Sequence, residues 1–252
     1  MSNEISIKFN ALALDSTTIC VSKIDYSSSN VVSQHDIPKS NEMIIETPKR
    51  GPLNIGVDGT VIGSDYDDLR TNIDTLRAAL KDGKQKFIID DDRYVMAVLK
   101  SFKYEIVVYR RMAKWSADFV CGYPYWLAEN ATTDERVPTS NVTYELTNNG
   151  NAPARCKVII TADGGEIADD CLISNTTNGE GFNFRGTIAN TKALEVDNRY
   201  DSDAYEVLND GTDAHANFEG DFMTLDPGVN AVKFTGVADT KVTFTWRDTY
   251  EA

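Results

Sequence analysis

The feature that most constrains this sequence is the repeated alternation of apolar and polar residues with a period of two. In residues 241–247, KVTFTWR, the apolar Val242, Phe244 and Trp246 alternate with polar residues. The pattern recurs along the chain, in residues 101–109, 115–121 and 142–147. Such alternation is typical of half-buried strands in antiparallel sheets. The sequence therefore predicts a mainly β fold.

One segment has the periodicity of a helix instead. Between about residues 65 and 82, an apolar stripe at helical spacing is formed by Tyr66, Leu69, Ile73, Leu76 and Leu80. Ser64 is the expected N-cap, and aspartates in the first turn suit the helix dipole. Gly83 is expected to supply the left-handed exit. We predict a single long helix here.

The charge divides the chain into two unequal parts. Residues 1–130 hold 16 basic and 18 acidic residues, whereas residues 131–252 hold 9 and 21, so the net charges are −2 and −12. Strand patterns stop after Cys121 and a polar stretch follows. We predict an N-terminal β domain over 1–128, a linker over 129–140 and a C-terminal domain over 141–252.

Composition argues against several classes of partner. An acidic second half repels nucleic acid and anionic membranes. No apolar run approaches the roughly 20 residues that span a bilayer, and the N-terminus lacks the features of a secretory signal. The four cysteines form no metal-binding spacing and lie in or beside apolar stretches. We therefore predict buried free thiols in a protein made in the cytoplasm, with no nucleic-acid or membrane partner.

Catalytic and metal-binding patterns are largely missing from the sequence. The two histidines, His35 and His215, lie in polar surroundings without a nucleophile motif. The acidic stretch from Asp201 to Asp213 departs from the EF-hand pattern, and its Asn209–Gly211 segment favours a tight hairpin turn. A pair of carboxylates in this acidic half remains open as a hydrolytic arrangement. The prediction is a protein that is not an enzyme and needs no cofactor or metal.

The stretch 219–232, EGDFMTLDPGVNAV, combines carboxylates, an aromatic residue and a Pro-Gly pair. Pro227 presets the second position of a turn and Gly228 accepts the positive φ of the third, which is a type II signature. Leu225 and Val232 can bury on either side of that turn. We interpret the stretch as a structural corner between two strands.

Several of these motifs together resemble the siphophage distal tail proteins. The C-terminal half carries the family's elements in order: Asn149, Gly150 and Pro153, then the GDFxxLxPGxN pattern of 220–230, then the closing VTFTWRDTY. The N-terminal half agrees through its single helix, the stretch DDDRYVMAVLKSFKY and the closing FVCGYPYWL. The resemblance spans nearly the whole chain.

The resemblance implies a structural role. Such proteins have an N-terminal β-barrel-like domain with one helix that closes into a hexameric ring, and a galectin-like β-sandwich that projects from it. They join the tail tube protein to the baseplate hub, a tail-associated protein or tail fibres. By resemblance, this chain is expected at the virion tail tip after assembly in the cytoplasm of the bacterial host.

Two sets of residues follow as candidates for contact. The ring interface is expected in the N-terminal part, on the irregular arm before the helix, at Val31, Val32, Ile37, Met43, Ile44 and Ile45. The alternative function is a carbohydrate-binding receptor-recognition module. Its candidate ligand-facing aromatics are Tyr200, Tyr205 and Phe218.

Overall fold

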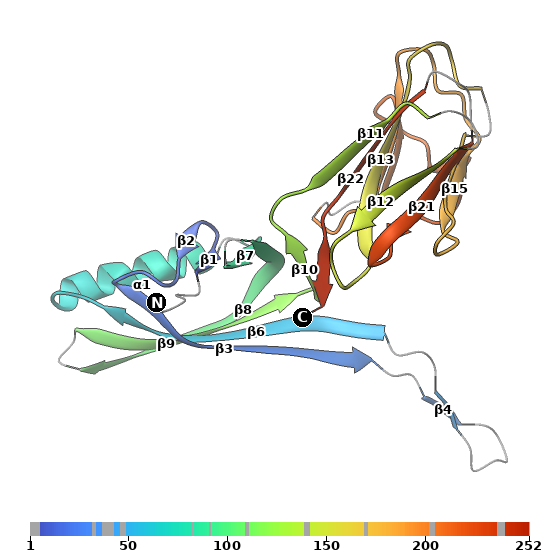
Figure 1. Cartoon of the computed structure of the whole chain (residues 1–252). Helices are drawn as coiled ribbons and strands as arrows, with labels where there is room; N and C mark the ends of the chain where they lie inside the picture. Colours follow the sequence, from blue (N-terminus) through green and yellow to red (C-terminus); the bar gives the residue numbers. More distant parts are fainter. Residues whose placement is uncertain are drawn as a thin grey trace. The chain divides into compact units, whose positions relative to one another are not determined.

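The computed structural model describes residues 6–31, 34–36, 43–45, 49–81, 83–90, 92–108, 111–138, 142–168, 171–201, 205–235 and 240–251. Within 29–49 and at residue 108, only the backbone is described. The chain forms two compact units, Met1–Trp126 with Ala252, and Leu127–Glu251. Each unit is described below by itself (Figure 1).

The N-terminal unit is built on an antiparallel sheet with the order β2-β1-β7-β8-β9-β6-β3. Its strands are β1 (Ile7–Phe9), β2 (Leu12–Ala13), β3 (Ile19–Val31), β6 (Lys49–Ile62), β7 (Lys84–Ile89), β8 (Arg93–Val108) and β9 (Met112–Cys121). Between β3 and β6 lie β4 (Gln34–Asp36) and β5 (Met43–Ile45), which pair with each other. The strand β10 (Tyr125–Ala128) follows β9.

Helix α1 (Tyr66–Leu80) lies over one face of this sheet, as Figure 1 shows. Leu69, Ile73, Leu76 and Leu80 are buried as predicted, whereas Tyr66 is 38% exposed. The N-cap is Asp65 rather than Ser64, because the Asp65 carboxylate accepts from the amide of Asp68 at 2.9 Å. Among the described residues, α1 is the one α-helix, and no helix is long and apolar enough to cross a membrane.

The C-terminal unit is a sandwich of two antiparallel sheets. One sheet has the order β11-β22-β13-β16-β17-β18 and the other β12-β21-β14-β15-β19, while β20 pairs with β13. The strands of the first sheet are β11 (Thr132–Arg136), β13 (Ala154–Ala162), β16 (Ala193–Asp197), β17 (Glu206–Asn209), β18 (Thr212–Asp213) and β22 (Thr240–Trp246), with β20 (Thr224–Leu225) beside β13. Those of the second are β12 (Thr143–Asn148), β14 (Cys171–Asn175), β15 (Gly181–Phe184), β19 (Phe218–Gly220) and β21 (Gly228–Thr235). The short helix η1 (His215–Asn217) and β23 (Thr249–Glu251) complete the unit.

Apolar side chains from the inner faces of both sheets form one core. It includes Val158 and Phe244 of the first sheet and Ile173 and Phe234 of the second. These residues alternate with exposed or half-buried ones along each strand, so the predicted period of two is confirmed in this unit. The mainly β fold class is confirmed as well.

The segment predicted as a linker differs from that expectation. Residues Thr132–Arg136 form β11, which pairs with β22 from Thr132 opposite Trp246 to Arg136 opposite Val242. Its polar composition suits an edge strand, where one side faces solvent and charges discourage pairing with other chains. Polarity alone does not distinguish such a strand from a linker, which is why the sequence pattern predicted a linker over these residues.

The hairpin turns follow the sequence closely. Asp210 and Gly211 have φ values of 50° and 75° between β17 and β18, as a tight hairpin requires. Gly228 has a φ of 92° at the corner between β20 and β21. The predicted corner is therefore confirmed.

Buried thiols are also confirmed, apart from Cys20. Cys121, Cys156 and Cys171 are buried and free, and Cys20 is half-buried. Burial raises the pKa of each buried thiol to about 12, which keeps it protonated and unreactive near neutral pH.

The facing of β22 leads to a direct prediction. Phe244 is 3% exposed in the core, and Thr243 points to the other side of the strand. We expect Phe244→Ala to lower the free energy of unfolding of the C-terminal unit by about 3–5 kcal/mol. Thr243→Ala should change it by about 0.5 kcal/mol or less. Chemical denaturation measures both, and similar effects from the two variants would contradict the assigned facing.

Candidate functional surfaces

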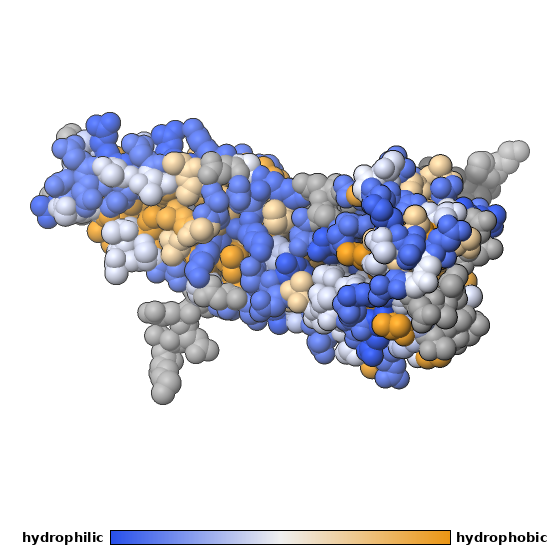
Figure 2. All heavy atoms as spheres, turned by 90° about the horizontal axis from the view of Figure 1, so that it is seen from above, coloured by the Kyte–Doolittle hydropathy of each residue, from blue (hydrophilic) through white to orange (hydrophobic). Residues whose placement is uncertain are grey.

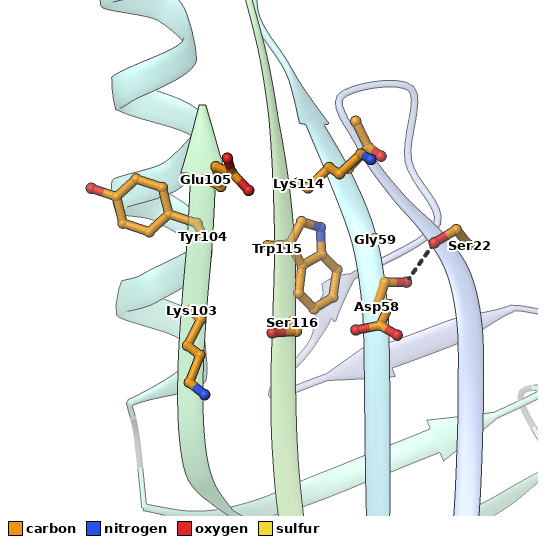
Figure 3. A pocket seen from close by; sticks show the side chains of 10 residues that line it. Ser22, Asp58, Gly59, Lys103, Tyr104, Glu105, Lys114, Trp115 and Ser116 are labelled. Atoms are coloured by element: carbon orange, nitrogen blue, oxygen red, sulfur yellow. Dashed lines mark hydrogen bonds between the residues drawn. The ribbon is translucent and has the colours of Figure 1, made fainter. Parts of the chain in front are cut away.

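A shallow hollow of about 420 Å³ lies across four strands of the N-terminal unit (Figure 3). It is lined from β3, β6, β8 and β9 by polar side chains, with Gly59, Tyr104 and Trp115 between them. The polar residues are Ser22, Asp58, Thr60, Lys103, Glu105, Lys114 and Ser116. The hollow is open to solvent along the sheet.

Strand register explains why these polar side chains share one face. Asp58 lies opposite Ser116, which lies opposite Lys103, and residues directly opposite each other point to the same side of a sheet. One residue along, Trp115 points to the other side and is 3% exposed. A Cβ on Gly59 would lie 2.6 Å from the Trp115 ring, so this glycine leaves room for the indole.

The hollow is a solvent-exposed surface that carries both acidic and basic side chains. Glu105 and Lys114 lie opposite each other on β8 and β9, and Asp58 lies two strands from Lys103. Acidic and basic groups thus alternate across the face. Within the described part of the chain, no three His, Cys, Asp or Glu side chains gather as metal ligands would.

Exposed apolar side chains concentrate on the same strand, β8. Hydrophobic side chains gather on the N-terminal unit in the view of Figure 2. On β8, Val98, Tyr104, Ile106 and Val107 are 39%, 46%, 38% and 38% exposed. The sequence pattern predicted a half-buried apolar face on this strand, formed by Phe102, Tyr104, Ile106 and Val108. The apolar side chains of β8 are therefore more exposed than predicted.

The predicted ring-interface residues lie partly outside the described chain. Val31 ends β3, and Met43, Ile44 and Ile45 form β5, with only their backbone described. Val32 and Ile37 lie outside the described residues. Their role stays a prediction.

The three predicted ligand-facing aromatics belong to one surface cluster of the C-terminal unit. Arg155 lies 4.0 Å from the centre of the Tyr200 ring and 5.1 Å from that of Tyr205. Tyr205 also contacts Phe222 edge-on at 5.4 Å, and Phe222 contacts Phe218 at 4.9 Å. Arg155 therefore faces both tyrosine rings, and Tyr205 is the most exposed ring of the cluster at 56%. Binding of a glycan here stays a prediction.

The acids between 197 and 213 are dispersed rather than convergent. Asp197 pairs with Arg199, Asp201 with Arg247, Asp210 with Lys192 and Asp213 with His215. Asp203 lies outside the described residues. Each of these four aspartates thus has its own basic partner, and the partner of Asp213 is a cation only when His215 is protonated.

His215 is held between two acceptors on the protein surface. Its Nδ1 lies 2.6 Å from the Asp213 carboxylate and its Nε2 lies 3.1 Å from the Tyr205 carbonyl. The hydrogen bond to Asp213 raises the pKa of His215. The side chain of His35 is not described.

Sequence reasoning missed the polar hollow and the bare strand beside it. Lys103 and Lys114 look like ordinary solvent-facing residues on strands with a period of two. Only the pairing of β9 with β8 on one side and with β6 on the other brings them together with Asp58. The unusually apolar half of β8 was visible in the sequence, but its exposure depends on which elements cover it.

Comparison with known proteins matches part of the chain to a family model and the whole chain to solved structures. Residues 149–250 match the model of the siphovirus-type tail component, C-terminal domain. The crystal structure of the Dit protein of phage SPP1, described as a paradigm of the hub adsorption apparatus in phages that infect Gram-positive bacteria, aligns with a TM-score of 0.72 at 16% identity. The alignment covers 96% of this chain and 98% of that one.

A chain of the phage P2 baseplate, in its activated conformation with Ca, aligns with a TM-score of 0.51 at 8% identity. The same baseplate with Sr gives 0.50 at 9%. Each alignment covers 96% of this chain and 98% of the other. No curated protein matches the chain.

Proposed function

We propose that this chain, which carries in residues 149–250 the C-terminal domain of the siphovirus-type tail components, is an adaptor that closes into a hexameric ring at the distal end of a phage tail. The resemblance to distal tail proteins is confirmed by that family match and by the shared fold of the whole chain. A structural role in a phage tail or baseplate follows from both. The ring, its copy number and its partners are the proposal.

The observation that carries the ring is a sheet with two long open edges. Among the described residues, β3, which has 13 residues, pairs with β6 alone. On the other side, β7 pairs with β8 only from Arg93 to Val98, whereas β9 covers the inner edge of β8 from Val98 to Val108 and β10 also pairs with β8. Within the part of the chain that the structure describes, β7 thus leaves the outer edge of β8 uncovered beyond Val98. Long open edges present unpaired backbone groups that pair readily with another chain.

The directions of the strands make these two edges complementary. The pairs β8–β9, β9–β6 and β6–β3 are all antiparallel, so β8 and β3 run in opposite directions. The β3 edge of one copy can therefore add to the β8 edge of the next as an antiparallel pair. Contacts between two different edges are head-to-tail, and head-to-tail contacts that close form a ring.

The bare apolar side chains of β8 support the same surface. Tyr104 and Ile106 lie on the far half of β8, beyond the reach of β7. An exposed apolar group beside an open edge is expected to be covered when a neighbour adds to that edge.

The two faces of the sheet would then have different surroundings. Helix α1 covers one face, and the charge-mixed hollow occupies the other. We propose that the polar face lines the channel of the ring. The predicted arm, with Val31 and Met43 to Ile45, would reach the neighbouring copy from the β3 side. The proposed partners are the tail tube protein and a baseplate hub protein or tail fibres.

The test measures the mass of the full-length protein at high concentration by light scattering, with negative-stain images of the particles. Six-fold rings are expected. Ile106→Lys should weaken assembly more than tenfold, because burial of an isoleucine side chain contributes about 1.5–3 kcal/mol. Val229→Lys is the control, since Val229 is 56% exposed on the C-terminal unit. A two-fold dimer, or assembly insensitive to Ile106→Lys, would contradict the proposed ring.

A further inference from the structure

We propose that neighbouring copies pair β3 with β8 in one specific register, in which Asp25 lies opposite Lys103 and Lys23 lies opposite Glu105. The partner at this surface is a second copy of the same chain. The inference rests on the proposed ring and goes beyond it, because a ring could close in several registers.

The four charged residues lie on the same face of the sheet. Lys23 on β3 lies opposite Asp58 on β6, and Asp58 lies opposite Ser116 on β9. Ser116 in turn lies opposite Lys103 on β8, so Lys23 and Lys103 lie at the same position along the strands. Asp25 follows two residues after Lys23, and Glu105 two residues after Lys103, so both keep that facing. Each open edge thus presents one cation and one anion on the polar face.

These groups are available for new partners. Lys23 and Asp25 pair with each other at 2.5 Å, with side chains 61% and 60% exposed. An ion pair so exposed contributes little and exchanges readily. Lys103 and Glu105 are exposed, and neither forms an ion pair with any residue that the structure describes.

Bulges limit where the two edges can pair regularly. On β3, register shifts occur between Val21 and Lys23 and between Ser28 and Asn30. On β8, they occur between Leu99 and Ser101 and between Ile106 and Val108. The regular windows are therefore 23–28 and 101–106, and the proposed register aligns them almost completely.

The polar residues of both copies stay on the same face only in registers that are shifted from one another by two residues. The charges then select one of these registers. A shift one way places Lys103 opposite Lys23. A shift the other way places Glu105 opposite Asp25. Like charges directly opposite each other destabilise a strand pair, and opposite charges stabilise it. Of these three registers, only the proposed one gives two attractive pairs and no repulsive pair.

The other face of the strand pair is compatible with this register. Tyr26, 42% exposed, would lie opposite Phe102, and Ile24 opposite Tyr104. The exposed aromatic side chains of both edges would thus cover one another. Aromatic pairs and pairs of aromatic with β-branched residues are favourable across strands.

The register also has the stagger that a closed sheet needs. Within one copy, Lys23 and Lys103 lie at the same level of the sheet. Pairing Lys103 with Asp25 of the next copy shifts that copy by two residues along the strands. A sheet that closes on itself requires such a stagger, because its strands tilt relative to the axis.

Zero-length crosslinking of the full-length wild type tests the register directly. A carbodiimide joins a carboxylate to a lysine amine as an amide, and the carbodiimide itself becomes a urea as it takes up water. Equal amounts of ¹⁵N-labelled and unlabelled protein are mixed under assembling conditions, so mixed-isotope peptides identify links between copies. The expected links are Asp25–Lys103 and Glu105–Lys23.

Charge exchange provides the second test. Lys103→Glu and Asp25→Lys should each raise the concentration for half-assembly by about tenfold, because each replaces an attractive pair by a repulsive one. The double variant restores opposite charges and should assemble as the wild type does. Asp74→Lys is the matched control, since Asp74 is exposed on α1.

The outcomes separate the register from the ring. Rings in which mixed-isotope links join other residues, or in which the double variant fails to restore assembly, would overturn the register and leave the ring standing. A wild type that forms no rings at any concentration would overturn both.

Discussion

Replacing Asn230 with aspartate is expected to lower the free energy of unfolding of the C-terminal unit by about 5 kcal/mol or more. Asn230 is fully buried. Its Oδ1 accepts from the amide of Asp226 at 2.8 Å and from Nδ2 of Asn175 at 2.9 Å. Its Nδ2 donates to the carbonyls of Asp226 and Gly228, at 2.8 and 3.0 Å.

These four bonds close the Pro227–Gly228 corner and tie it to β14. A carboxylate at position 230 could still accept both bonds but could donate neither. Two carbonyl oxygens would then face a buried negative charge. Removal of hydrogen-bond partners in a buried site costs about 1–3 kcal/mol per group, and an unpaired buried charge adds to that loss.

The measurement is chemical denaturation followed by fluorescence, with Val229→Ala as the control. Val229 is the neighbouring residue of β21 and is 56% exposed, so its truncation should change stability by about 0.5 kcal/mol or less. If Asn230→Asp were tolerated as well as Val229→Ala, the corner would not depend on this amide.

Replacing Gly59 with valine is expected to disrupt the N-terminal unit by a comparable amount, about 5 kcal/mol or more, which exceeds the usual range for overpacking. A Cβ at this position would lie 2.3 Å from the Cys20 carbonyl oxygen and 2.6 Å from the Trp115 ring. Real Cβ atoms do not approach backbone so closely, so β3 or Trp115 would have to move. Either movement breaks the register of the sheet centre.

Gly56→Val is the matched control in the same strand. The nearest atoms to a Cβ at Gly56 are at 3.8 and 3.9 Å, which is ordinary contact. Since valine also favours strands over glycine, this control should change stability by about 1 kcal/mol or less. Near-UV circular dichroism of the two variants during thermal unfolding decides the matter. Equal melting curves would mean that the packing of Trp115 on Gly59 does not hold the sheet together.

The sequence predicted only part of the candidate surfaces. Tyr205 and Phe218 were candidate ligand-facing aromatics, and Phe222 contacts both of them. Tyr205 is exposed, whereas Phe218 is half-buried against the core. The polar hollow was not expected, because its side chains come from four strands, of which β3 and β6 are distant in the chain from β8 and β9. Nothing in a single strand marks Lys103 as a neighbour of Ser116 and Asp58.

Local chemistry is what the sequence by itself determined. The period of two placed Phe244 in the core, the helical period placed Leu69 and Ile73 on the buried face of α1, and positive φ at Gly211 and Gly228 made the turns. Each of these depends on residues within a few positions of one another, so the pattern is readable in one dimension.

Only the tertiary structure decided which strands lie at edges and which residues meet across them. Residues 132–136 form an edge strand because they pair with β22. The apolar side chains on the second half of β8 are exposed because β7 pairs with β8 only as far as Val98. The hydrogen bond from Asn175 to Asn230 forms because β14 pairs with β21. Strand order and register depend on contacts between distant segments, and those contacts are not encoded in any local period.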